Sequence, residues 1–82
     1  MKAEISARLR GVDLDSIFKI IGKYTDLITA NVNHVEGESG IFHCDAECTV
    51  KKGFENSQLS SRIRDEFIKN KIFDFTVGTK SI

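Results

Sequence analysis

Hydrophobic and polar residues alternate strictly at the start of the chain. Ala3, Ile5, Ala7 and Leu9 fall on one side of this alternation, and polar or charged residues fall on the other. Successive side chains of a strand point to opposite faces, so the pattern predicts a strand with one buried face and one wet face. Gly11 interrupts the alternation, and we expect the strand to end there.

The next segment has helical periodicity. Its apolar residues recur at i, i+3, i+4 and i+7, the spacing of one helix face, and are Leu14, Ile17, Phe18 and Ile21. We expect Asp13 to cap the N-terminus of this helix and Val12 to pack on Ile17 as a hydrophobic staple. Gly22 is the residue at which a left-handed stop is expected.

Two alternating segments, residues 27–35 and 41–50, flank the loop Glu36–Gly40, whose composition is typical of a hairpin. A register with Val35 opposite Ile41 joins the core-facing residues of both strands, pairing Val32 with Cys44, Ala30 with Ala46 and Ile28 with Cys48. A slip of one residue would turn all these side chains toward water, so the register is strongly specified.

The remainder of the chain predicts one more helix and one more strand. Asn56 or Ser57 is expected to cap the helix, which ends near Asn70. Its apolar line is formed by Leu59, Ile63 and Phe67, with Ile68 beside it. Residues 72–79 predict the last strand, whose core-facing residues are Phe73, Phe75 and Val77.

These elements run strand, helix, strand, strand, helix, strand. We predict an α+β fold of the ferredoxin-like βαββαβ type, a four-stranded antiparallel sheet with two helices on one face. The expected strand order is fourth, first, third, second, and a hairpin-centred α+β fold with another order is the alternative. The length of 82 residues predicts a single domain, residues 1–82.

The charge balance and the hydropathy of the chain predict which classes of partner and which cellular compartment are expected. Lys and Arg number 12, Asp and Glu number 12, and the formal net charge is zero, so no long-range field attracts nucleic acid or a membrane, and neither is expected as a partner. No apolar run reaches the length of a signal peptide or a membrane span, which makes the cytoplasm the expected location. Cys44 and Cys48 lie about 13 Å apart in one strand, beyond the disulfide limit of about 7 Å, and are expected to be buried free thiols.

The sharpest cluster of reactive side chains is the row His43, Asp45 and Glu47 on the wet face of one strand. An imidazole and two carboxylates suit a transition metal, but they lie about 6–7 Å apart in a line and do not converge as a metal site requires. A bare sheet also offers no cleft to desolvate an acid–base pair. We therefore predict no metal, no cofactor and no catalytic residue, and a cross-strand ion pair of Asp45 or Glu47 with Arg8.

The element order and spacing resemble those of ACT-type regulatory domains, ferredoxin-like modules that pair side by side and bind amino acids between subunits. Such domains usually carry a glycine after an acidic-basic-proline turn at the first strand–helix junction, whereas this chain has Arg10-Gly11-Val12-Asp13-Leu14 without proline. The resemblance implies topology and a small-ligand role, and no ligand-binding residue is carried over. RNA-recognition modules share the order but need aromatic residues on the open strands, where this chain has charged ones.

We expect a small non-enzymatic protein-interaction module, a regulator, adaptor or inhibitor, that acts through a sheet edge or the open sheet face. The strand Leu27–Val35 contains no charged residue and no proline, the features that protect native edges, so a homodimer or a strand of a protein partner is expected to pair with it. The expected partner-binding residues are Thr29, Asn31, Asn33, His43, Asp45, Glu47 and Arg8. The alternatives are an ACT-like domain that senses a small ligand or metal, and a small enzyme that uses His43, Asp45 and Glu47.

Overall fold

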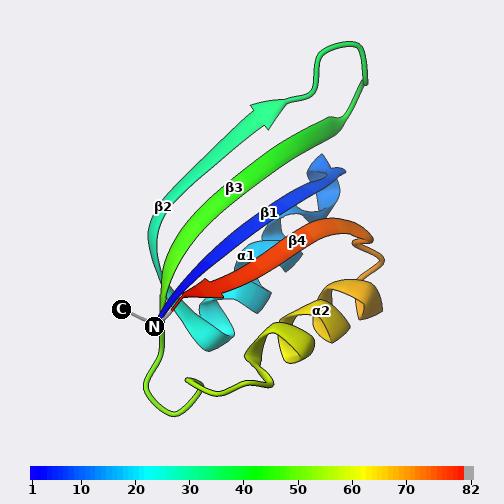
Figure 1. Ribbon diagram of the computed structural model, residues 1–82. Coiled ribbons are helices and arrows are strands. Elements are labelled where there is room, and N and C mark those ends of the chain that lie inside the picture. The colour runs from blue at the N-terminus through cyan, green and yellow to red at the C-terminus, as the bar shows by residue number, and fades with distance from the viewer. Residues whose placement is uncertain (81–82) are drawn as a thin grey trace.

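The computed structural model describes residues 1–80 and consists of one antiparallel sheet with both helices on one of its faces (Figure 1). The elements in chain order are β1 (Lys2–Arg10), the 3₁₀ turn η1 (Gly11–Asp13), α1 (Leu14–Tyr24), β2 (Thr25–His34), β3 (Ile41–Val50), α2 (Leu59–Lys69) and β4 (Asp74–Lys80). The strands lie in the order β2-β3-β1-β4. The predicted ferredoxin-like βαββαβ fold and its strand order are therefore confirmed. Neither helix is long and apolar enough to cross a membrane.

The register of the β2–β3 hairpin agrees with the sequence pattern over most of its length. Its central pairs are Val32 with Cys44, Ala30 with Ala46, Asn31 with Asp45 and Asn33 with His43. The predicted pairing of Ile28 with Cys48 is wrong, because a bulge at Ile28 shifts the register and places Leu27 opposite Cys48. A bulge sets two residues of one strand against one of its neighbour, and no alternation pattern announces the extra residue.

The core lies between the sheet and the two helices. Alternate residues of β1 and β3 line it as predicted, namely Ala3, Ile5, Ala7, Leu9, Cys44, Ala46, Cys48 and Val50. The helices contribute Ile17, Ile20, Ile21, Leu59, Ile63 and Phe67. Both cysteines are buried free thiols, as expected.

Helix α1 continues past the glycine at which it was expected to end. It reaches Tyr24, whose buried ring meets the ring of Phe54 edge-on at 5.1 Å. Burial of such a ring outweighs the roughly 1 kcal/mol that a helical glycine costs relative to alanine, so the stop predicted at Gly22 is wrong. The hydroxyl of Thr25 then closes the helix by donating to the carbonyl of Ile21 at 2.7 Å.

The N-terminus of α1 also differs from the prediction. Asp13 makes no side-chain cap and instead lies 3.1 Å from the guanidinium of Arg10. Val12 is 78 % exposed, so the staple onto Ile17 is wrong. The turn η1 places Val12 outside the core, because it inserts one tight turn between the strand and the helix.

Helix α2 ends in a Schellman motif without a glycine. Ile72 N–H donates to the carbonyl of Phe67 at 2.9 Å, and Lys71 N–H donates to the carbonyl of Ile68 at 3.0 Å. These two hydrogen bonds define the motif. The residue that follows the C-cap adopts a left-handed conformation in it. Lys71 has that conformation, with φ of 62°.

Because of the turn at Lys71, β4 begins at Asp74 and not at residue 72. The burial of Ile72 and Phe73 therefore differs from the prediction. Ile72 enters the core with 2 % exposure, whereas Phe73 is 70 % exposed, so the predicted inward direction of Phe73 is wrong. Phe75 and Val77 face the core side as expected and are partly buried there.

Strand β2 is more exposed than its alternation predicts. Ile28 and Val32, expected in the core, are 49 % and 40 % exposed. The physical reason is position: β2 is the end strand, and the far end of the β2–β3 hairpin projects beyond both helices (Figure 1). Burial on the helix side therefore requires a covering element as well as the correct strand face.

Candidate functional site

The face of the sheet opposite the helices carries the side chains that sequence reasoning selected. Their cross-strand pairs are Arg8 with His43, Asn33 with His43, Asn31 with Asp45 and Thr29 with Glu47. These residues come from β1, β2 and β3 and form one continuous polar surface, which we call the open face. The structure brings the predicted residues together, and their role in binding a partner stays a prediction.

Asp45 lies at the centre of the open face. Its Oδ1 accepts a hydrogen bond from the hydroxyl of Ser6 on β1, and its Oδ2 lies 3.1 Å from Nε2 of His43. The Ser6 hydrogen bond lowers the pKa of the Asp45 carboxyl, and the nearby imidazole of His43 adds to this effect. Both oxygens of the carboxylate are therefore engaged within the protein.

The predicted pairing of Arg8 with an acid of β3 is wrong. Arg8 forms its ion pair with Glu38 of the hairpin loop, and Glu47 lies 3.5 Å from the amine of Lys2. Arg8 stands directly opposite His43 in the register, so Glu38 supplies the negative charge that this position of β3 lacks.

This arrangement does not favour catalysis on the open face. A serine nucleophile requires a hydrogen bond to its base, but Ser6 donates to Asp45 and not to His43. Within residues 1–80, no three His, Cys, Asp or Glu side chains are grouped as ligands for one metal ion. A polar hollow of about 240 Å³ lies on this face, lined in part by Ser6, Asn31 and Asp45.

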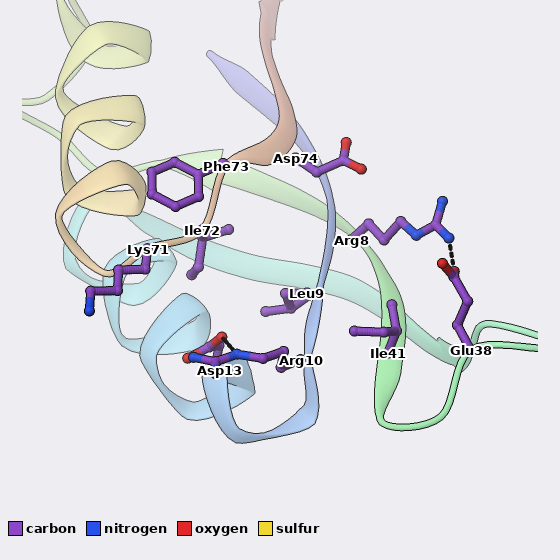
Figure 2. A pocket seen from close by; sticks show the side chains of 10 residues that line it. All are labelled: Arg8, Leu9, Arg10, Asp13, Glu38, Ile41, Lys71, Ile72, Phe73 and Asp74. Atoms are coloured by element: carbon purple, nitrogen blue, oxygen red, sulfur yellow. Dashed lines mark hydrogen bonds and ion pairs between the residues drawn. The ribbon is translucent and has the colours of Figure 1, made fainter.

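A larger pocket of about 320 Å³ lies at the end of the sheet where β1 finishes and β4 begins (Figure 2). Its apolar lining comes from Leu9, Ile41, Ile72 and Phe73. Its charged lining comes from Arg8, Arg10 and Lys71 and from Asp13, Glu38 and Asp74. Apolar surface with both signs of charge around it is the lining that a small amphipathic ligand requires.

Some of the charged side chains that line this end pocket form ion pairs with each other, and others do not. The pairs Arg10–Asp13 and Arg8–Glu38 stand on two of its sides (Figure 2). Within the described residues, the ion pairs include neither Lys71 nor Asp74. The pocket is therefore lined by an ammonium and a carboxylate for which residues 1–80 supply no ionic partner.

The end pocket was not predicted from the sequence because three separated segments, residues 8–13, 38–41 and 71–74, build it. Antiparallel pairing of β1 with β4 places Arg8 opposite Asp74, and Gly11 N–H donates to the carbonyl of Gly40 at 2.9 Å, which draws the hairpin loop to the end of β1. The one sequence signal was the Lys71–Asp74 segment, where charged residues flank two apolar ones between a helix and a strand.

Comparisons with known proteins identify the fold. No protein-family model matches the sequence, and the comparison with curated proteins gave no significant match. The crystal structure of the ACT domain from GTP pyrophosphokinase of Chlorobium tepidum is similar with a TM-score of 0.70 and 21 % identity over 95 % of this chain and 97 % of that chain. The solution NMR structure of the same domain gives a TM-score of 0.58 and 20 % identity over 98 % and 85 %.

A larger enzyme contains the same arrangement. A formyltetrahydrofolate deformylase from Pseudomonas putida KT2440 is similar with a TM-score of 0.68 and 9 % identity over 100 % of this chain and 29 % of that chain. This chain therefore matches less than a third of the deformylase. At such identities the likeness establishes the fold alone.

Proposed function

We propose that this chain is a non-enzymatic regulatory module that binds a small zwitterionic ligand of the amino-acid class in the end pocket. The observation that carries the proposal is an apolar lining that also includes side chains of opposite charge, Lys71 and Asp74. The likeness to ACT domains supports the regulatory class, because those domains have the same fold.

The chemistry of the pocket matches each part of such a ligand. The ammonium of Lys71 can donate to a carboxylate, and the carboxylate of Asp74 can accept from an amine, both as charge-assisted hydrogen bonds. The apolar lining, which includes Leu9 and Ile72, suits an aliphatic or aromatic ligand side chain.

The backbone at Lys71 gives a second reason. A non-glycine residue in the left-handed region costs about 1–2 kcal/mol, and such costs concentrate at binding sites. Lys71 has φ of 62° where the Schellman motif would favour glycine. A lysine at this position supplies a charge that glycine cannot supply.

The test is a titration of the wild-type chain with each of the twenty proteinogenic L-amino acids, followed by NMR chemical shifts and thermal melting. We expect one or a few apolar amino acids to raise the melting temperature and to shift the amides of Ile72, Phe73 and Asp74. Lys71→Gln and Asp74→Asn should each weaken binding by about tenfold, because each removes one charge-assisted bond.

Lys52→Gln is the matched control. It also neutralises an exposed lysine, but in the turn that follows β3, outside the pocket lining, so binding should be unchanged. Absence of any shift with all twenty amino acids, or binding that Lys71→Gln and Asp74→Asn leave intact, would contradict the proposal.

A second candidate function is docking of a protein partner on the open face, and it is supported by the continuity of that face. His43 and Asp45 are exposed neighbours on β3, with Asn31 and Asn33 beside them on β2. We expect the triple variant His43→Ala, Asp45→Ala, Glu47→Ala to keep its fold, because exposed changes usually cost under about 0.5 kcal/mol each.

The corresponding experiment is affinity capture from the host lysate with wild type and with the triple variant, each analysed by mass spectrometry. A partner of the open face is captured by wild type and lost by the triple variant. If every captured protein binds both baits equally, the open face is not the contact surface.

A further inference from the structure

We propose that Arg8 exchanges between two acidic partners, Glu38 of the hairpin loop and Asp74 of β4, and that a ligand in the end pocket selects the pairing with Glu38. The exchange itself does not depend on the proposed function, whereas its consequence for a ligand rests on that function. The inference is carried by the position of Arg8 between the two carboxylates, all three of which line the end pocket.

The guanidinium of Arg8 has both carboxylates within its reach. Arg8 forms its ion pair with Glu38, and its side chain extends toward Glu38 and away from Asp74 (Figure 2). Asp74 nevertheless stands directly opposite Arg8 in the register of β1 and β4. Directly opposed side chains of antiparallel strands have Cβ atoms about 4.5–5.5 Å apart and form ion pairs when their charges are opposite. Rotation about the side-chain bonds of Arg8 is therefore sufficient to change its partner.

The other cross-strand neighbour of Arg8 is His43 on β3. The imidazole of His43 lies 3.1 Å from the carboxylate of Asp45, so Asp45 is engaged on the side away from β4. The ion pairs of residues 1–80 do not include Asp74. Asp74 is therefore the carboxylate that competes with Glu38 for Arg8.

The two pairings of Arg8 are close enough in free energy to exchange. The side chains of Arg8 and Glu38 are 43 % and 44 % exposed, and Asp74 is also exposed. Ion pairs between exposed side chains contribute little because water solvates the separated charges well. A change of charge at either carboxylate should therefore shift the populations of the two pairings by about two- to fivefold.

The pairing with Glu38 ties the hairpin loop to the end of β1. Two backbone hydrogen bonds lie at the same place: Gly11 N–H donates to the carbonyl of Gly40 at 2.9 Å, and Ile41 N–H donates to the carbonyl of Glu38 at 3.3 Å. When Arg8 leaves Glu38, the loop loses a side-chain contact that supports both bonds. The amides of Gly11 and Ile41 therefore report which partner Arg8 has.

A ligand in the end pocket should bias this exchange. The proposed function assigns the ligand ammonium to Asp74, and an ammonium there repels the guanidinium of Arg8. Arg8 then stays with Glu38, and the hairpin loop is held more firmly. Because coupling between two equilibria is reciprocal, loss of Glu38 should leave Arg8 on Asp74 and weaken the ligand.

The first experiment measures amide hydrogen exchange at Gly11 and Ile41 in the ligand-free chain. Asp74→Asn should slow exchange at both amides by about twofold, because Arg8 then has Glu38 as its one acidic partner. In an Arg8→Gln background the same substitution should have no effect. The difference should also disappear in about 1 M salt, where the Debye length falls to about 3 Å.

Asp65→Asn is the matched control. It removes an exposed carboxylate from α2, outside the pocket lining, and should leave exchange at Gly11 and Ile41 unchanged. Equal exchange in wild type and Asp74→Asn would overturn the proposal. So would an effect of Asp74→Asn that persists in the Arg8→Gln background, since Arg8 would then not transmit it.

The second experiment adds each of the twenty proteinogenic L-amino acids to the wild-type chain. One that binds should slow exchange at Ile41, and Glu38→Gln should weaken its binding by about twofold in the wild-type background but not in the Arg8→Gln background. An Arg8-dependent effect of Asp74→Asn without any amino-acid binding supports the exchange and contradicts the proposed function. Amino-acid binding with no effect of Asp74→Asn on the ligand-free chain supports the proposed function and overturns the exchange.

Discussion

Lys71 illustrates how one residue can oppose the local preference of the backbone. Its left-handed φ of 62° ends α2 and directs Ile72 into the core while Phe73 stays exposed beside the end pocket. A glycine would adopt this conformation without steric strain. At position 71, the stability of the fold therefore favours glycine, whereas a positive charge in the pocket requires lysine.

We expect Lys71→Gly to stabilise the fold by about 1 kcal/mol and to abolish binding of the proposed zwitterionic ligand. Urea denaturation measures the first effect and calorimetric titration the second. Lys69→Gly is the matched control, because Lys69 lies in the last turn of α2, where glycine costs about 1 kcal/mol. Equal destabilisation by both substitutions would show that the strain at Lys71 is negligible.

The two thiols report on the tightness of the core. Cys44 and Cys48 are 1 % and 0 % exposed, and burial raises the pKa of both thiols. We expect labelling by a thiol reagent at neutral pH to be slow in buffer and fast in urea, because reaction requires both access and the thiolate. Rapid labelling of the folded chain would mean that β3 opens locally.

The same shift has a consequence for stability at high pH. A folded-state pKa above the unfolded value means that the folded chain holds the thiol proton more tightly. The contribution of each cysteine is then fully present below the ordinary thiol pKa and is lost as pH rises above about 8.5. Replacing both cysteines with alanine should flatten that part of the stability profile.

At the scale of elements, Glu66 joins the two helices. It accepts a hydrogen bond from the hydroxyl of Tyr24 and lies 3.1 Å from the amine of Lys23, both on α1. The Glu66 carboxylate therefore forms these contacts with the neighbouring helix. The Tyr24 hydrogen bond lowers the pKa of Glu66, and the charge of Lys23 adds to the effect.

We expect Tyr24→Phe and Glu66→Gln each to destabilise the fold by about 1 kcal/mol, and the double variant to lose less than the sum. Because the folded pKa of Glu66 is lowered, its contribution is present above the ordinary carboxyl pKa of about 4.3 and is lost as pH falls below it. Denaturation of the four proteins of this cycle at neutral and acidic pH is the measurement. Additive losses that do not change with pH would exclude a direct interaction.

Elements with a clean alternation could be predicted, and those set by tertiary contacts could not. The buried face of β1 and the register of the central β2–β3 pairs follow from strict alternation, which one-residue slips would destroy. The extension of α1 to Tyr24 depends on a ring packed against Phe54, and the bulge at Ile28 has no sequence signature. The open face was predictable because its residues share a strand face, whereas the end pocket joins segments that only the folded chain brings together.

At the scale of the whole molecule, the sheet is longer than the layer that covers it. The far end of the β2–β3 hairpin projects beyond both helices (Figure 1), and there Val32 and His34 on the helix side of the sheet are exposed. β1 and the central part of β3 lie between other strands and under the helices. Backbone hydrogen bonds therefore have different surroundings along a single strand.

This uneven cover implies that the chain does not open as a single unit. In native-state hydrogen–deuterium exchange, the amides of Ile5, Ala7 and Ala46 should exchange only through global unfolding. The amides of Asn33 and Val35 at the projecting end should exchange through local opening at a lower free energy, since they lack buried apolar neighbours. Equal protection at both places would contradict this, and a graded profile would make the hairpin end the segment where the molecule first loses its structure.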